Sequence, residues 1–92
     1  MQRVEKKAWP EWFQEVWDGE KTFEYRLADF DIEPSDVFVM KEWSPQTEEY
    51  SGRALEAEVG FIGKVQSRRW DKPNDPAIHD HYILSLKNLR KQ

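Results

Sequence analysis

Charged side chains of both signs gather in a short stretch that begins after Gly19. Lys21, Glu24 and Arg26 stand there at the start of an expected strand, directly after an expected helix end. Fixed charges close to a core cost desolvation free energy unless they are paired or face a ligand. A lysine can bind a phosphate or polarise a carbonyl, and an arginine can hold a phosphate in a bidentate fork. The stretch therefore predicts either a polar ligand site or a solvated hairpin edge with mixed charges.

The role of Glu24 stays open at this level. Its carboxylate can accept hydrogen bonds from the exocyclic amine of a base, or it can act as a general base. A desolvated Lys21 is the second candidate for acid–base chemistry. Glu24 can equally form a structural pair with Arg26, because side chains two residues apart on a strand share one face.

Two other positions are candidates for the same ligand. Lys7, in the first expected strand, either adds to the site or belongs to a solvated basic run. Trp70 follows Arg68 and Arg69 in a segment without any period. These side chains can stack on a base and hold the phosphates of single-stranded nucleic acid. Trp70 can instead close the small core as a lid.

Metal chemistry has little support in the sequence. His79 and His81 flank Asp80, and on a strand the two rings project from the same side. No third ligand stands at a spacing typical of a metal site, so the pattern favours a polar loop end. There is no cysteine, which excludes disulfides and thiolate sites. We expect neither a metal nor another cofactor.

The residues before the charged stretch predict a helix over 10–18. Pro10 suits the first helical position, and Gly19 is typical of the residue that follows a helix end. Five apolar side chains recur at the spacing of one helix face: Trp9, Trp12, Phe13, Val16 and Trp17. Three tryptophans on one face also suit a platform for stacking bases. Because the spacing is that of a buried face, we expect this stripe to pack as core.

Alternation and apolar runs predict strands over 3–8, 21–27, 37–43, 53–61 and 82–86. In the second strand we expect the rings of Phe23 and Tyr25 to face the core, on the side opposite to Glu24. Residues 63–80 show no period and predict a long loop, and 87–91 read as a basic tail. One early helix and hairpin-connected strands indicate an α+β domain around a small closed or nearly closed barrel.

The bulk properties limit the function. The 92 residues suffice for one small domain over 1–92, and its five tryptophans, if inside, can fill a small barrel. The formal net charge of −4 makes the chain a poor candidate for coating long duplex nucleic acid. A local basic pocket can still hold one nucleotide or a short single strand. Since no stretch suits a membrane span or a signal peptide, we expect a cytoplasmic monomer with no membrane partner.

The stretch from Gly19 to Arg26 fits the pattern Gly-x-Lys-x-x-Glu-x-Arg and resembles the signature of the ASCH domains, a branch of the PUA-like fold. The likeness extends over further segments: 7–13, 41–45, 50–53 and 82–86. The resemblance implies a small PUA-like (ASCH) β-barrel of about five to six strands with one helix after the first strand. It also implies a cleft lined by the signature residues. In one turn, Ser35 replaces a glycine typical of the family, and serine is tolerated in turns.

The resemblance also bears on activity. Related ASCH proteins are associated with binding of RNA or modified nucleosides, and one branch hydrolyses the amide of acetylated cytidine. Its threonine nucleophile follows the motif lysine at the position where this chain has Glu24, and Thr22 does not match. The implied function is therefore an RNA- or nucleotide-binding module. The alternatives are a small hydrolase of modified nucleosides or RNA, with Lys21 and Glu24 as catalytic candidates, and a protein-interaction domain.

Overall fold

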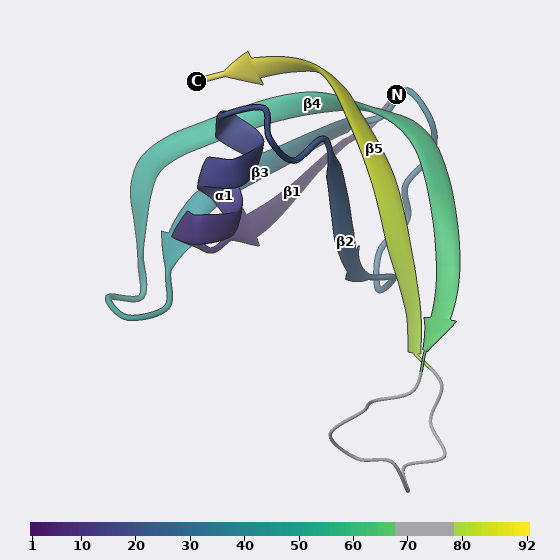
Figure 1. The fold of residues 1–92 in the computed structure, drawn as a ribbon, viewed down its shortest axis with the longest axis horizontal. Helices are drawn as coiled ribbons and strands as arrows, with labels where there is room; N and C mark the ends of the chain where they lie inside the picture. Colours follow the sequence, from purple (N-terminus) through teal and green to yellow (C-terminus); the bar gives the residue numbers. More distant parts are fainter. Residues whose placement is uncertain (68–78) are drawn as a thin grey trace, which may run out of the picture.

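The computed structural model describes residues 1–67 and 79–92, and within these ranges it contains five strands and one helix (Figure 1). They follow in the order β1 (Arg3–Ala8), α1 (Pro10–Trp17), β2 (Phe23–Leu27), β3 (Val37–Ser44), β4 (Glu49–Ser67) and β5 (His79–Lys91). The expected small α+β fold, with one helix after the first strand, is confirmed. In the described ranges no helix has the length and apolar character that a membrane crossing requires.

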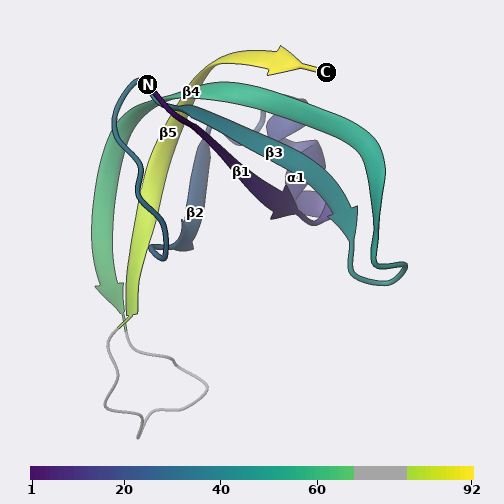
Figure 2. The same ribbon diagram turned by 180° about the vertical axis from the view of Figure 1, so that it is seen from behind.

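The strands form one mixed sheet in the order β1-β3-β4-β5-β2. β1 runs parallel to β3, whereas the other pairings are antiparallel. The sheet curls into a half-barrel, with α1 against its concave side (Figures 1 and 2). β1 and β2 stand at opposite ends of the strand order, but the curl brings them to the two sides of one open seam.

The core lies between α1 and the inner face of the sheet. Phe13 and Val16 of α1 are buried there against apolar side chains of β3, β4 and β5. The expected apolar strand is present as β3, whose residues 38–40 are all buried. Burial of these large side chains supplies the main favourable free energy of folding.

The turn before β3 is held by one carboxylate. Asp36 accepts hydrogen bonds from the backbone N–H groups of Gln2 (3.0 Å) and Glu33 (2.9 Å), and these bonds keep the pKa of Asp36 below its ordinary value. Ser35 has a φ of 76°, in the left-handed region that favours glycine. The turn therefore forms with serine, and its conformation explains why glycine suits this position.

The tryptophan stripe is only partly core, so the expectation is corrected. Phe13 and Val16 are buried, but Trp12 is 48% exposed and Trp9 is exposed as well. α1 has only eight residues, and its inward arc is filled by Phe13 and Val16. Trp9 stands before the first helical residue, and Trp12 lies on the flank of the buried arc. Trp17 is half-buried against the core.

The two faces of β2 are reversed relative to the expectation. Phe23 and Tyr25 are exposed, whereas Glu24 faces inward and is buried. Alternation along a strand shows which residues share a face, but the partner strands decide which face lies inside. Glu24 tolerates the inner position because Lys21 and Arg26 pair with it there.

The hairpin of β4 and β5 takes up both ends of the loop expected over 63–80. β4 continues to Ser67, which pairs with His79 at the start of β5. Backbone groups form this ladder, so it requires no apolar alternation of the side chains. The remaining residues 68–78, with the candidate Trp70, lie outside the described part of the chain.

Two other expected irregular segments belong to strands. The basic tail over 87–91 is the end of β5, where Lys91 pairs with Leu55 of β4. The expected break at Gly52 lies inside β4, and Gly52 adopts a φ of 95° there. A glycine accommodates such a local kink without ending the strand.

Candidate ligand-binding cleft

An open cleft of about 510 Å³ lies where the end of β1, the start of α1 and β2 meet. Its lining residues come from these elements and from the turn after α1: Lys7, Trp9, Trp12, Lys21, Glu24, Tyr25 and Arg26. The structure thus brings the charged signature residues together in one cleft with Lys7. It adds two tryptophans and a tyrosine that sequence reasoning did not place there.

Glu24 is the central charge of this cleft, and its side chain is only 5% exposed. Lys21 Nζ lies 3.6 Å from Oε1 of Glu24. Arg26 donates hydrogen bonds to Oε2 from Nε (3.2 Å) and from Nη2 (2.8 Å). A buried carboxylate needs such partners because desolvation disfavours its charged form. Of the roles that the sequence left open, the structural pair with Arg26 is therefore present.

Arg26 links the two edge strands across the seam. Its Nη2 group also donates to the backbone carbonyl of Lys7 on β1, 2.9 Å away. The guanidinium lies over the ring of Phe38, with Cζ 5.7 Å from the ring centroid. Among the residues that the structure describes, Nη1 has no acceptor. The guanidinium is thus fixed along one edge and keeps two N–H donors for a ligand.

Lys7 meets the cleft in a different way from the other cations. Its carbonyl accepts the hydrogen bond from Arg26, while its ammonium lies over the Trp43 ring, 4.3 Å from the centroid. Trp43 does not line the cleft. Lys7 therefore positions Arg26 through its backbone, and its side chain packs on a neighbouring surface.

The cleft carries an excess of positive charge. Lys21 and Arg26 share the single carboxylate of Glu24, which leaves one formal positive charge in excess, in a chain of net charge −4. The 3.6 Å between Lys21 Nζ and Glu24 exceeds a hydrogen-bond distance. The ammonium donors of Lys21 therefore remain available, and the arrangement suits an anionic group.

Trp9 and Trp12 form an aromatic wall beside these charges. Their rings stack with centroids 5.0 Å apart and an interplanar angle of 1°. Such a separation leaves no room for a third ring between them, so only the outer faces of the pair are open to a ligand. The sequence feature that could have revealed this wall is the aromatic stripe, which is broader than the face that a short helix can bury.

A second ion pair anchors the helix that carries Trp12. Arg53 of β4 donates to both carboxylate oxygens of Glu42, from Nε (3.0 Å) and Nη2 (2.9 Å), and to Gln14 Oε1 (2.8 Å) on α1. The hydrogen bonds from Arg53 lower the pKa of Glu42, and those to Glu42 raise the pKa of Arg53. This network fixes α1 on the sheet and so fixes the aromatic wall.

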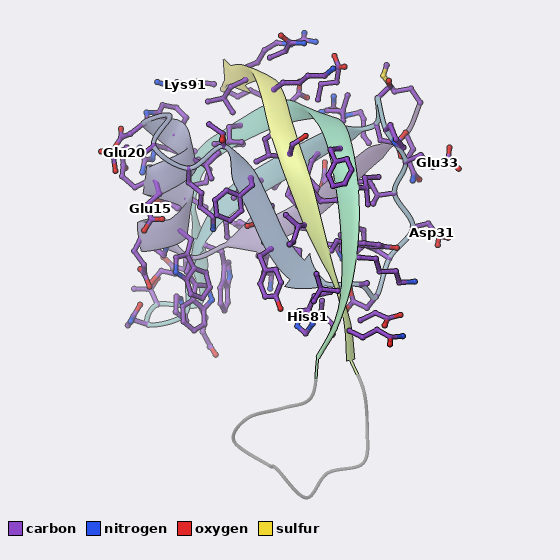
Figure 3. All side chains as sticks on the ribbon, turned by 45° about the vertical axis from the view of Figure 1, so that its right-hand side comes forward. Glu15, Glu20, Asp31, Glu33, His81 and Lys91 are labelled. Atoms are coloured by element: carbon purple, nitrogen blue, oxygen red, sulfur yellow. The ribbon has the colours of Figure 1, made fainter. Side chains whose placement is uncertain are left out.

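Of the two histidines near Asp80, His81 is the one whose side chain the structure describes. The ring of His81 stacks on Tyr25, with centroids 4.9 Å apart, and Figure 3 shows His81 near the start of β5. In the described ranges no three His, Cys, Asp or Glu side chains are grouped in a way that would hold a metal ion. His81 instead contributes to the surface that continues from Tyr25.

A protein-family model described as a domain of unknown function, DUF3850, matches residues 5–85. The chain therefore belongs to this family. The matched range includes every residue that lines the cleft. No curated protein matches the chain.

Proposed function

We propose that this DUF3850 domain binds a nucleotide, or a short single-stranded stretch of RNA, in the cleft around Glu24. The observation that carries the proposal is the arrangement of Lys21 and Arg26. Glu24 holds both cations in place, yet each keeps N–H donors that are not used within the described chain. Because these groups are ordered before a ligand arrives, binding loses less conformational entropy.

The phosphate of the ligand occupies the positive end of the cleft. Arg26 offers the two N–H groups of Nη1, and Lys21 offers its ammonium as a point charge. The half-buried environment strengthens both contacts, since the side chains are 24% and 19% exposed and water screens them incompletely. One excess positive charge matches the single negative charge of a phosphodiester in RNA and offsets part of the charge of a phosphomonoester, which is about −1.5 to −2 at pH 7.

The base of the ligand stacks on the wall formed by Trp9 and Trp12. Stacking of a base on an aromatic side chain contributes about 1–3 kcal/mol and tolerates every base, since each base has a π-face. The wall and the cations line the same cleft, so one nucleotide can contact both. This geometry predicts a preference for nucleotides over nucleosides, with little selectivity among bases.

The resemblance to the ASCH domains supports the same proposal. The signature residues Lys21, Glu24 and Arg26 all line the cleft, and the half-barrel is compatible with a PUA-like barrel. Membership of the PUA-like superfamily stays a prediction, because it is inferred only from the signature and the neighbouring segments.

A hydrolase is the less favoured alternative. Both oxygens of Glu24 already contact protein cations, so proton abstraction from water or substrate would first require one of these contacts to break. Incubation with an acylated cytidine and with RNA, followed by chromatography of the products, tests this alternative. Turnover that Glu24→Gln abolishes would replace the binding proposal.

The binding proposal is tested by calorimetric titration with ribonucleoside 5′-monophosphates, the matching nucleosides and a short RNA. We expect the nucleotides and the RNA to bind, and Lys21→Ala to weaken binding by about 10- to 100-fold. Lys41→Ala is the matched control, because it removes the same charge from an exposed lysine paired with Glu5 outside the cleft. Equal effects of the two variants, or no binding by the wild type, would overturn the proposal.

A further inference from the structure

The outer face of β2, β5 and β4 is a continuous surface whose own residues include no Asp, Glu, Lys or Arg, and Lys21 Nζ borders it, 5.4 Å from the ring centroid of Phe23. Register places Tyr25, Ile83 and Gly63 in one row across the three strands, and Leu27, His81 and Val65 in the next. The third row joins Phe23 to Ser85, whose Oγ accepts a hydrogen bond of 2.6 Å from the backbone N–H of Phe61. We call these nine residues the outer face. None of them is Asp, Glu, Lys or Arg, although these four types make up 35% of the chain.

The outer face is apolar and uncovered. Six of its side chains are large and apolar, with exposed fractions from 37% to 71%: Phe23, Tyr25, Leu27, Phe61, Val65 and Ile83. With roughly 150–250 Å² for a whole aromatic side chain, these fractions leave on the order of 500 Å² of apolar surface in contact with water. A patch of this size is at the upper end of what monomeric proteins expose, which is about 300–600 Å².

Phe61 is the most exposed ring of the outer face, at 71%. A Cβ atom at Gly63 would lie 3.3 Å from Cε1 of Phe61 and 3.7 Å from Cβ of Ile83. The ring of Phe61 therefore folds back across the backbone of Gly63 toward β5. The absence of a side chain at Gly63 keeps this part of the surface flat, which suits packing against another flat sheet.

In place of the monomer expected from the sequence, we propose that the outer face is the interface of a homodimer, covered by the same face of a second copy. A largely apolar surface suits a partner of the same kind, and each copy of this chain presents one. A two-fold interface uses one patch twice, so the self-complementary chemistry of the outer face is sufficient. Together with its rim, about 500 Å² of apolar area approaches the ≈ 800 Å² per partner of a standard interface.

The composition of the outer face favours a protein partner over nucleic acid. Interface centres are depleted in charged residues and enriched in aromatic residues, as this face is. An RNA surface needs several cations for the phosphates, whereas the nine residues include neither lysine nor arginine and Lys21 reaches only the margin at Phe23. Tyr25 belongs to both the outer face and the lining of the cleft, so the dimer would place the second copy beside each ligand site.

Sedimentation velocity over a range of protein concentrations tests the proposal without any ligand. We expect a reversible dimer for the wild type. Phe61→Glu should raise the dimer dissociation constant at least 10-fold, because it replaces the most exposed ring of an apolar interface by a charge. Tyr50→Glu is the matched control, since Tyr50 is also an exposed ring of β4 but lies outside the outer face.

Disulfide trapping locates the interface directly, because the chain has no cysteine of its own. Ile83 lies at the centre of the nine residues, and so nearest to the two-fold axis. Under mild oxidation Ile83→Cys should form a cross-linked dimer at a protein concentration at which Tyr50→Cys stays monomeric. A wild type that is monomeric at every concentration, or equal cross-linking of the two variants, would overturn the proposal. A monomeric wild type whose affinity for RNA falls in Phe61→Ala would show that nucleic acid occupies the face instead, which also overturns it.

Discussion

Of the arginine–glutamate pairs on the sheet, those of Arg53 and Arg26 differ in how the arginine contacts its carboxylate. Arg53 contacts both oxygens of Glu42 and also Gln14, and its guanidinium lies over Phe13. Arg26 bonds one oxygen of Glu24 and a backbone carbonyl. Among the described residues, Nη1 has no acceptor in either arginine. We call the Arg53–Glu42 pair closed, because Arg53 contacts both oxygens of its carboxylate, and the Arg26–Glu24 pair open, because Oε1 of Glu24 is left to Lys21 in the cleft.

The comparison shows that similar ion-pair chemistry serves two purposes. The closed pair satisfies a buried carboxylate and anchors α1, so its loss should be felt in stability. The open pair satisfies a buried carboxylate as well, but it orders cations that face the cleft. The difference lies in the third partner of each arginine, which is a side chain of α1 for Arg53 and the carbonyl of edge strand β1 for Arg26.

The largest loss of stability is expected at Phe13, the buried ring on which the guanidinium of Arg53 packs. Phe13→Ala should lower the free energy of unfolding by about 3–5 kcal/mol, because it leaves a cavity beneath Arg53. Trp12→Ala, on the neighbouring helix position, should cost less than about 1 kcal/mol, since its ring is largely exposed, but it should weaken nucleotide binding. Denaturant titration of both variants checks this contrast. Similar losses of stability would mean that the two faces of α1 are not distinct.

Replacement of each arginine by lysine separates the two roles while it keeps the charge. Arg53→Lys should lower the midpoint of unfolding, because a lysine cannot bridge Glu42 and Gln14. Arg26→Lys should instead weaken nucleotide binding about 10-fold, because it removes the free edge of the guanidinium. Thermal denaturation and calorimetry on the same samples provide both readings. Weaker nucleotide binding in Arg53→Lys together with lower stability in Arg26→Lys would contradict the comparison.

The smallest effect is the pH dependence of the closed pair. The pKa of Glu42 is lowered from its ordinary 4.5, chiefly by hydrogen bonds from Arg53. A carboxylate with a lowered pKa in the folded state stabilises the fold above its ordinary pKa, and this contribution is lost as the pH falls below it. The stability difference between wild type and Glu42→Gln should therefore be constant at neutral pH and shrink below about pH 4.5. A stability difference that does not change with pH would show that the ionised carboxylate of Glu42 does not stabilise the fold.

Local patterns were sufficient for several features. Helical spacing predicted α1, and the continuous apolar run predicted the buried residues of β3. Glu24 and Arg26 were predicted to share one face, because the two-residue period of a strand is a local property. The prediction failed for the ends of β4 and β5, where backbone pairing extends a ladder through residues with no apolar alternation.

The sequence by itself determined which elements form and which charged residues lie close together, because both depend on the helix and strand periods. Only the tertiary structure decided which face of β2 is inside, since β2 pairs with β5, a strand distant in sequence. The curl of the sheet into a half-barrel brings Arg26 to the backbone carbonyl of Lys7. Packing of α1 on this sheet leaves Trp9 and Trp12 exposed. Burial depends on how the sheet and the helix pack together, so the periodicity of one segment does not show which of its faces is buried.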